Sequence, residues 1–350
     1  MGKRTGSFMT VVFILLGISV LAGCTILEEM VMEEAGETAV SGQYPIEKET
    51  PAAAKQTKEN KEGQPAGKKG KSVCESYEEE VEPGVCSYKV DCKNPKTCEA
   101  WAENLIFDME EWYGELMYSE EWYLDEKMLR KSKKDADVLA SYPVRGNTIR
   151  IDPSDEDEQY YAWLWERFTW IIPSKERMMV SNYEVFEHVD LMAYVIQDDE
   201  DYEKWTYAVN VEQATFETER VLTDIHEFGH LLALNAKQVD PYKSESSCKT
   251  YMWDEGCANR GSYMYEFYKQ FWEDGDSEDE ENFVSDYAMN DVYEDFAESW
   301  SHFVVTPRPE GDSIVEQKIE FFYDYEELVM LRANLLGRMA SWLERNVEYE

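Results

Sequence analysis

Histidine is scarce in this sequence, with only 4 among its 350 residues. Two of them, His226 and His230, stand four positions apart in the segment TDIHEFGHLLALNA at 223–236. With histidine so rare, chance would produce one such HExxH arrangement at roughly the one per cent level or below, so the motif is informative. A surface helix that merely carries two histidines is the alternative.

Basic side chains are also few, with 34 Lys and Arg against 74 Asp and Glu and a formal net charge of −40. Residues 1–73 hold 9 of each kind, so the whole net charge lies in residues 74–350. A surface of this charge repels nucleic acids and anionic headgroups, and we expect no nucleic-acid partner. The acidity suits basic substrates or loosely held divalent cations, but solubility in salt is the simplest explanation.

The uncharged run Phe8–Leu21 is too short to span a bilayer, which takes about 20 residues. It follows Lys3 and Arg4 and ends in LAGC at 21–24, which resembles the lipobox of prokaryotic lipoproteins. We therefore predict a signal peptide at 1–24 and a lipid on Cys24 that anchors the protein to the outer face of a membrane. The alternatives are an uncleaved anchor and an ordinary signal peptide.

Large apolar residues are few in residues 25–73, which are rich in Glu, Lys, Ala, Gly and Gln. Such a segment cannot bury enough surface to fold, and it is predicted to be a flexible tether. All 11 tryptophans follow it, so one folded domain is expected over residues 74–350, without internal repeats.

Of the 7 cysteines, six remain besides Cys24, an even number that suits disulfides outside the cytoplasm. The simplest pairing joins Cys248 to Cys257 and keeps the cluster in 74–98 to itself, where three pairings are open. A zinc knot in that cluster is the competing interpretation, although no C-x2-C element is present. The six disulfide candidates are Cys74, Cys86, Cys92, Cys98, Cys248 and Cys257.

Hydrophobic periodicity predicts an α+β fold, mostly helical with a small sheet. Segments 189–197 and 204–211 alternate and read as two strands joined by an acidic turn. The second of them is either an ordinary half-buried strand or the sheet edge along which a peptide substrate pairs. Helices are expected at 99–118, 158–171, 216–235, 261–272, 291–305 and 315–345.

The HExxH segment suits a catalytic zinc site, which needs three protein ligands and one open position. On a helix, His226 and His230 project from one face and can reach the same Zn²⁺ ion. Glu227 lies on the flank of that face, where it can act as general base towards an activated water.

The third ligand is not part of the extended motif HExxHxxGxxH, because Ala233 and Ala236 replace the required glycine and histidine. A later helix can supply a glutamate instead. Segment 286–305 has helical spacing, with Glu294, Glu298 and His302 along one side.

Residues 285–298, SDYAMNDVYEDFAE, resemble the corresponding segment of lethal-factor-type zinc metallopeptidases, which belong to the gluzincins. The resemblance covers about 221–305 and implies a zincin-like domain. It also implies that Glu294 is the third zinc ligand, that Tyr287 helps hold the oxyanion, and that Glu298 supports a ligating imidazole from outside the metal site. Either Glu298 or His302 as the third ligand is an alternative, while Asp295 is expected to be solvated and His188 structural.

These observations together predict a lipid-anchored, extracytoplasmic zinc metallopeptidase acting on protein or peptide substrates. A surface binding protein that keeps the fold without turnover is one alternative. A zinc amidase acting on cell-wall crosslinks is another, because the chemistry at the metal would be the same.

Overall fold

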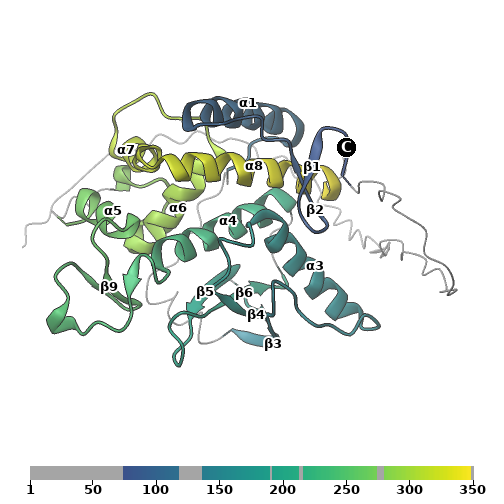
Figure 1. The fold of residues 1–350 in the computed structure, drawn as a ribbon, viewed down its shortest axis with the longest axis horizontal. Helices are drawn as coiled ribbons and strands as arrows, with labels where there is room; N and C mark the ends of the chain where they lie inside the picture. Colours follow the sequence, from purple (N-terminus) through teal and green to yellow (C-terminus); the bar gives the residue numbers. More distant parts are fainter. Residues whose placement is uncertain (1–73, 118–135, 190, 213–215, 274–279, 348–350) are drawn as a thin grey trace, which may run out of the picture. The chain divides into compact units, whose positions relative to one another are not determined.

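The computed structural model describes residues 74–117, 136–189, 191–212, 216–273 and 280–347 (Figure 1). The predicted signal peptide, Cys24 and the tether at 25–73 lie outside the described residues. Helices and small sheets alternate along the chain, so the α+β prediction is confirmed.

The largest sheet has the strand order β3-β4-β6-β5. Strands β4 and β6 run parallel, whereas β3 and β5 run antiparallel to their neighbours at the two edges. The predicted pair β5 and β6 is present. Strand β6 lies inside the sheet, so of the two alternatives for 204–211 the substrate-pairing edge is excluded and the ordinary strand is present. The strands are β3 (Asp137–Pro143), β4 (Val180–Glu187), β5 (Ala193–Gln197) and β6 (Trp205–Asn210).

Helix α3 (Glu156–Ile171) packs on this sheet through aromatic side chains. Phe168 stacks on Tyr207 of β6 with ring centroids 4.0 Å apart, and Trp165 lies 5.1 Å from Tyr183 of β4. These rings bury a large apolar area and leave few rotamers available, which fixes the helix on the sheet.

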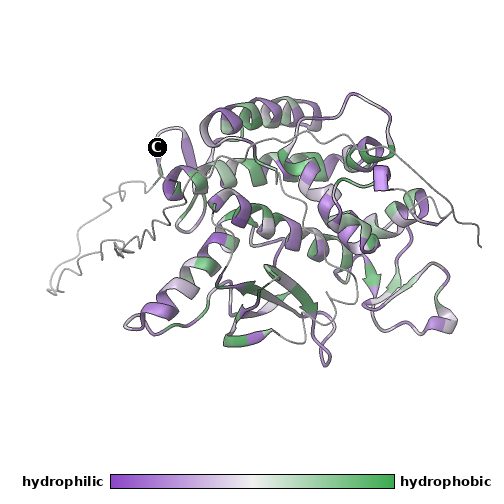
Figure 2. Cartoon of the chain, turned by 180° about the vertical axis from the view of Figure 1, so that it is seen from behind, coloured by the Kyte–Doolittle hydropathy of each residue, from purple (hydrophilic) through white to green (hydrophobic). Residues whose placement is uncertain are grey.

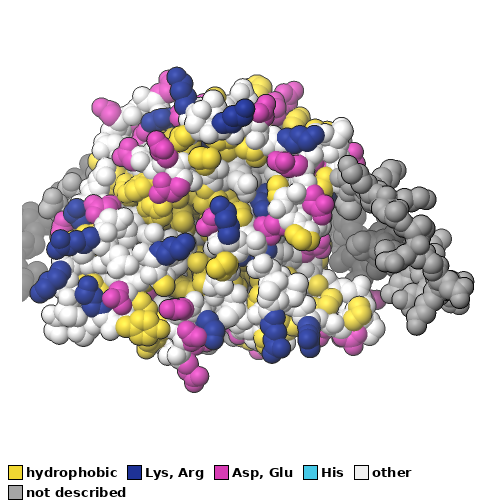
Figure 3. All heavy atoms as spheres, in the orientation of Figure 1, with side chains coloured by type: hydrophobic (Ala, Val, Ile, Leu, Met, Phe, Trp, Pro, Cys, Tyr) yellow, Lys and Arg dark blue, Asp and Glu magenta, His cyan; other side chains and the backbone are white. Residues whose placement is uncertain are grey.

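The helices form further layers beyond the sheet (Figure 1). Helix α8 (Glu326–Asn346) contacts α1 (Pro95–Tyr113), and it also contacts α3, α4 (Glu217–Leu234) and α6 (Val292–Val305). Figure 2 shows hydrophobic and hydrophilic residues mixed along these helices, as expected for helices that pack one face against the core. Figure 3 shows acidic and basic side chains surrounding a central group of hydrophobic ones on one face.

Two predicted helices differ from the structure. Helix α1 ends at Tyr113 instead of 118, because Gly114 has a φ of 81° that terminates it. The predicted helix 315–345 is three elements: α7 (Ile314–Glu320), η4 (Phe321–Asp324) and α8. Tyr325 separates η4 from α8, because its backbone is extended, with a φ of −110° and a ψ of 103°.

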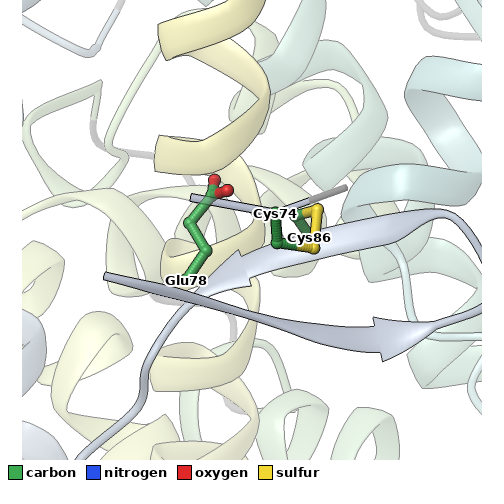
Figure 4. A group of neighbouring side chains, drawn as sticks. All are labelled: Cys74, Glu78 and Cys86. Carbon is green, nitrogen blue, oxygen red and sulfur yellow. A yellow bond between two sulfur atoms is a disulfide. The ribbon is translucent and has the colours of Figure 1, made fainter. Parts of the chain in front are cut away.

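The cysteine cluster forms two disulfides, Cys74–Cys86 and Cys92–Cys98. The zinc knot is therefore excluded, because the sulfurs bind one another. Figure 4 shows Glu78 beside the first disulfide, but its carboxylate is already held by Ser341 and Arg345 of α8. These contacts fix the hairpin β1 (Glu78–Glu82) and β2 (Val85–Tyr88) on α8.

The predicted Cys248–Cys257 bridge is also present. It joins Cys248 to β9 and closes the loop that contains β8, within a three-stranded sheet of order β7-β9-β8 that precedes helix α5 (Tyr263–Phe271) in the chain. The strands are β7 (Val239–Asp240), β8 (Met252–Trp253) and β9 (Gly256–Ala258). Three disulfides indicate an oxidising, extracytoplasmic environment. Within the described part of the chain, no helix has the length and apolarity needed to cross a membrane.

We expect the Glu78 contacts to give acid-dependent stability. Burial opposes ionisation, but Arg345 and Ser341 outweigh it and hold the pKa of Glu78 below its usual 4.5. A lowered folded-state pKa stabilises the fold above about pH 4.5, and this stabilisation is lost as pH falls through the folded value.

Replacing Glu78 with Gln should lower the free energy of unfolding by about 2 kcal/mol at pH 7, because Arg345 loses its buried partner. The difference from the native chain should begin to shrink below about pH 4.5, where the unfolded carboxyl takes up its proton, and should approach zero once the pH has fallen through the lower folded-state pKa. Urea unfolding at several pH values measures both effects. Glu79→Gln, at the exposed neighbour, is the control; a pH-independent difference for Glu78→Gln would contradict the assignment.

Candidate metal centre

Helix α4 carries the HExxH segment and is buried over most of its length. Asp224, two residues ahead of His226 and fully buried, accepts hydrogen bonds from Arg167 Nε over 2.7 Å and from the Tyr207 hydroxyl over 2.5 Å. Arg167 belongs to α3 and Tyr207 to β6. A buried carboxylate with charged and neutral donors on two elements fixes α4 relative to both of them.

Helix α6 begins at Asp291, whose side chain accepts the backbone N–H groups of Tyr293 and Glu294. This N-cap fixes the first turn, from which Glu294 projects. Further along, α6 crosses α4 at very short range. A Cβ placed on Gly229 would lie 3.0 Å from Trp300 Cδ1 and 3.1 Å from Ala297 Cα. Glycine at 229 therefore permits the approach that brings the two helices' polar residues together.

Three atoms from the two helices converge at the crossing. His226 Nε2 and His230 Nε2 lie 3.1 and 3.2 Å from Glu294 Oε2, and the two nitrogens are 3.2 Å apart. Two ligands of a tetrahedral zinc ion, with bonds of about 2.0–2.1 Å, lie about 3.3 Å apart. The triangle formed by His226, His230 and Glu294 thus has the dimensions of one face of such a site, and this buried group could hold a metal ion.

The other nitrogen of His226, Nδ1, lies 2.7 Å from Glu298 Oε1. A carboxylate partner assigns the proton to Nδ1 and directs the lone pair of Nε2 towards Glu294 and His230. The second oxygen of Glu298 accepts a hydrogen bond from Ser285 Oγ over 2.7 Å. Glu298 therefore lies outside the three-atom group, on the far side of the imidazole.

The carboxylates and imidazoles stabilise each other's charge. Burial alone would raise the pKa of Glu294, but His230 and His226 outweigh it and hold that pKa well below the usual value. Burial alone would lower the pKa of His226, but Glu294 and Glu298 raise it well above the usual value. A metal ion that binds at Nε2 would therefore displace a proton.

Two further predicted residues lie beside this group. Glu227 is buried, with 5% of its surface exposed, and its charge acts on Tyr287. The Tyr287 ring centroid is 5.6 Å from that of His226. Burial, reinforced by Glu294 and Glu227, raises the pKa of Tyr287 well above its usual value. Its hydroxyl therefore keeps its proton and can donate a hydrogen bond.

The remaining histidines lie elsewhere. His302 is one turn beyond Glu298 on α6 and is not part of the three-atom group. Burial lowers its pKa, against a smaller opposing effect of Glu298. His188 accepts the backbone N–H of Leu191 at Nδ1 over 3.0 Å, and its carbonyl accepts from Asn210, which agrees with a structural role.

The expectation that Asp295 is solvated was wrong. Its side chain is fully buried and lies 2.7 Å from Lys318 Nζ and 2.8 Å from Trp272 Nε1. These contacts tie α6 to α7 and to the end of α5. The pairing depends on residues 23 positions or more apart in sequence, so helical periodicity on α6 alone does not reveal it.

Three polar residues near the metal centre were missed by the sequence interpretation. Asp291 is recognisable in part, because Asp directly before a helical segment is a common N-cap signal. Ser285 lies in the loop before α6 and lacks this signal. Glu255 lies in the turn between β8 and β9, and its Oε2 is buried without a hydrogen-bond partner in the structure. Burial raises the pKa of Glu255, while Tyr293 and His230 act in the opposite direction. No local pattern at 255 indicates this position near α6.

Comparisons of the chain with protein-family models, curated proteins and solved structures found no match.

The crossing of α4 and α6 predicts an unusual sign for one substitution. In a helix interior, Gly→Ala normally stabilises by about 1 kcal/mol through helix propensity. At Gly229 the added methyl meets the Ala297 backbone, so we expect Gly229→Ala to destabilise the protein by about 1–3 kcal/mol. Thermal unfolding of the native chain and the variant measures the change. A gain in stability would show that the helices are farther apart.

Proposed function

We propose that the protein is a zinc-dependent metallopeptidase with a zincin-like catalytic domain, anchored outside the cytoplasm by a lipid on Cys24. The observation that supports it most directly is the convergence of His226, His230 and Glu294 within 4.8 Å of one another on two buried helices. Two imidazoles and one carboxylate are the ligand set of many catalytic zinc sites, and they leave one coordination position open. That geometry, and the two motifs that supply it, favour Zn²⁺ over harder cations, which prefer all-oxygen sites.

The residues around the three ligands supply the other functions that peptide hydrolysis needs. When bound, zinc would polarise the scissile carbonyl and lower the pKa of a water molecule. Glu227 would accept the proton of the attacking water and later deliver it to the leaving amine. Tyr287, whose hydroxyl keeps its proton, would donate a hydrogen bond to the oxyanion that develops from the carbonyl.

The sheet offers a position for an extended substrate. Strand β5 lies at one edge, pairs with β6 on its inner side, and contacts α4. A peptide could add to the outer side of β5 by main-chain hydrogen bonds, close to the helix that carries His226 and Glu227. Protein or peptide substrates are therefore the proposed partners, and the acidic surface argues against nucleic acid.

Two other functions share parts of this geometry. A surface binding protein without turnover would not need Glu227, yet this carboxylate is retained and buried beside the ligands. An amidase acting on cell-wall crosslinks would use the same metal chemistry. A panel of protein, peptide and cell-wall substrates distinguishes the peptidase from the amidase.

The metal site is tested by the zinc content of the purified full-length chain. We expect about one zinc per native chain and a large loss in Glu294→Ala, because the variant keeps only two ligands. His302→Ala is the matched control on the same helix and should keep its zinc. Zinc retained by Glu294→Ala but lost from His302→Ala would assign the third ligand to His302, and a native chain without zinc affinity would remove the basis for an enzyme.

The role of Glu227 is tested by Glu227→Gln, which keeps the side-chain volume but cannot accept the proton. We expect zinc content to be unchanged and the rate of casein hydrolysis to fall by about 10²–10⁴-fold. Full activity in this variant would contradict the general-base assignment. Loss of zinc together with activity would instead indicate that Glu227 supports the metal site.

A further inference from the structure

One hydroxyl group connects two parts of the metal centre. Ser285 Oγ donates a hydrogen bond to Glu298 Oε2 over 2.7 Å. The same Ser285 Oγ accepts a hydrogen bond from the backbone N–H of Ala288 over 3.1 Å. Glu298 uses its other oxygen to hold His226 Nδ1. Ser285 is therefore linked through a carboxylate to a proposed metal ligand, and through an amide to the turn that contains Tyr287.

The first link controls the orientation of His226. The last torsion of a glutamate side chain is broad, so a carboxylate held at one oxygen can rotate. With His226 on Oε1 and Ser285 on Oε2, both oxygens of Glu298 are held and the plane of the carboxylate is fixed. The direction in which it receives the imidazole N–H is fixed with it, and this sets where Nε2 points.

The second link controls the position of Tyr287. This residue begins η3 (Tyr287–Met289), a single 3-10 turn that contacts α6. The preceding Asp286 makes no side-chain cap. Backbone bonds from Met289 N–H to Asp286 O and from Asn290 N–H to Tyr287 O close the turn, and the bond from Ala288 N–H to Ser285 Oγ ties it to the Ser285 side chain. A short 3-10 turn has weak hydrogen-bond geometry of its own and depends on such contacts.

We propose that Ser285 is a positioning residue that couples the orientation of His226 to the placement of Tyr287. Building on the proposed function, it lets one hydroxyl align a metal ligand and an oxyanion donor at the same time. Loss of the hydroxyl should therefore weaken metal binding and also slow the reaction when the metal is saturating.

The metal arm of the test uses the full-length chain and competition with a coloured zinc chelator. Removing a direct partner of a metal-ligating histidine costs about 10–100-fold in affinity, and Ser285 acts one bond further away. We expect Ser285→Ala to lower zinc affinity by about threefold to tenfold. Ser285→Thr keeps the hydroxyl and should restore the affinity. Ser301→Ala is the control, because the Ser301 hydroxyl donates only to Ala297 O within α6.

The kinetic arm is a double-mutant cycle with Tyr287→Phe, measured on labelled casein at saturating zinc. Ser285→Ala should lower kcat by about tenfold with KM nearly unchanged, because it displaces a group that acts on the transition state. In the Tyr287→Phe background the same change should cost about twofold or less, because the displaced hydroxyl is already absent. Equal losses of kcat in both backgrounds would overturn the coupling.

The outcomes separate this inference from the proposed function. If the native chain binds zinc and cleaves casein, and Ser285→Ala equals it in both, Ser285 has no positioning role and the proposed function stands. If the native chain binds no zinc, both are overturned. Should Ser285→Ala lose its thermal unfolding transition, Ser285→Cys replaces it, since a thiol has similar volume but is a weak donor, and the same losses are expected.

Discussion

The close approach of α4 and α6 is the constraint on which the candidate metal centre depends. Each helix brings a small residue to the crossing, Gly229 from the HEFGH segment and Ala297 from the EDFAE segment. The polar residues flank these two positions along each helix. A larger side chain at either position would separate the helices, and the distances of 3.1–3.2 Å between the imidazole nitrogens and Glu294 would be lost.

The two helices are held from opposite sides by buried charges. Asp224 fixes α4 to α3 and to the sheet through Arg167 and Tyr207, and Asp295 fixes α6 to α7 through Lys318. Each of these carboxylates stands within two residues of a proposed ligand. Buried ion pairs add little net stability compared with apolar packing, but breaking one is costly, so they restrict the helices to one relative position. That restriction is what a preorganised metal site requires.

The sequence was informative where function depends on local spacing. A helical interval of four residues links His226 and His230 within α4, and a recognisable second motif marks Glu294 on α6. The structure brings the three residues together. It was uninformative where a position depends on distant contacts. The helix expected at 315–345 is interrupted at Tyr325, whose extended backbone separates η4 from α8. Strand β1 was not expected, because glutamate is uncommon in strands. The strand is held in place by distant contacts, the Cys74–Cys86 disulfide and Arg345 of α8.

The same distinction explains why Ser285 and Glu255 were missed although both lie near the centre. Glu298 follows Glu294 by one helical turn, so periodicity predicts its place on the same side of α6, while its outer role was implied by the resemblance. Ser285 reaches Glu298 from a loop 13 residues earlier, and only the folding of η3 against α6 brings them together. Glu255 arrives on a turn whose position depends on the Cys248–Cys257 bridge and on packing of Trp253 against Tyr293. The proposed metal ligands and the carboxylate that orients His226 can thus be found from two helices, whereas Ser285 and Glu255 come from loops placed by the whole domain.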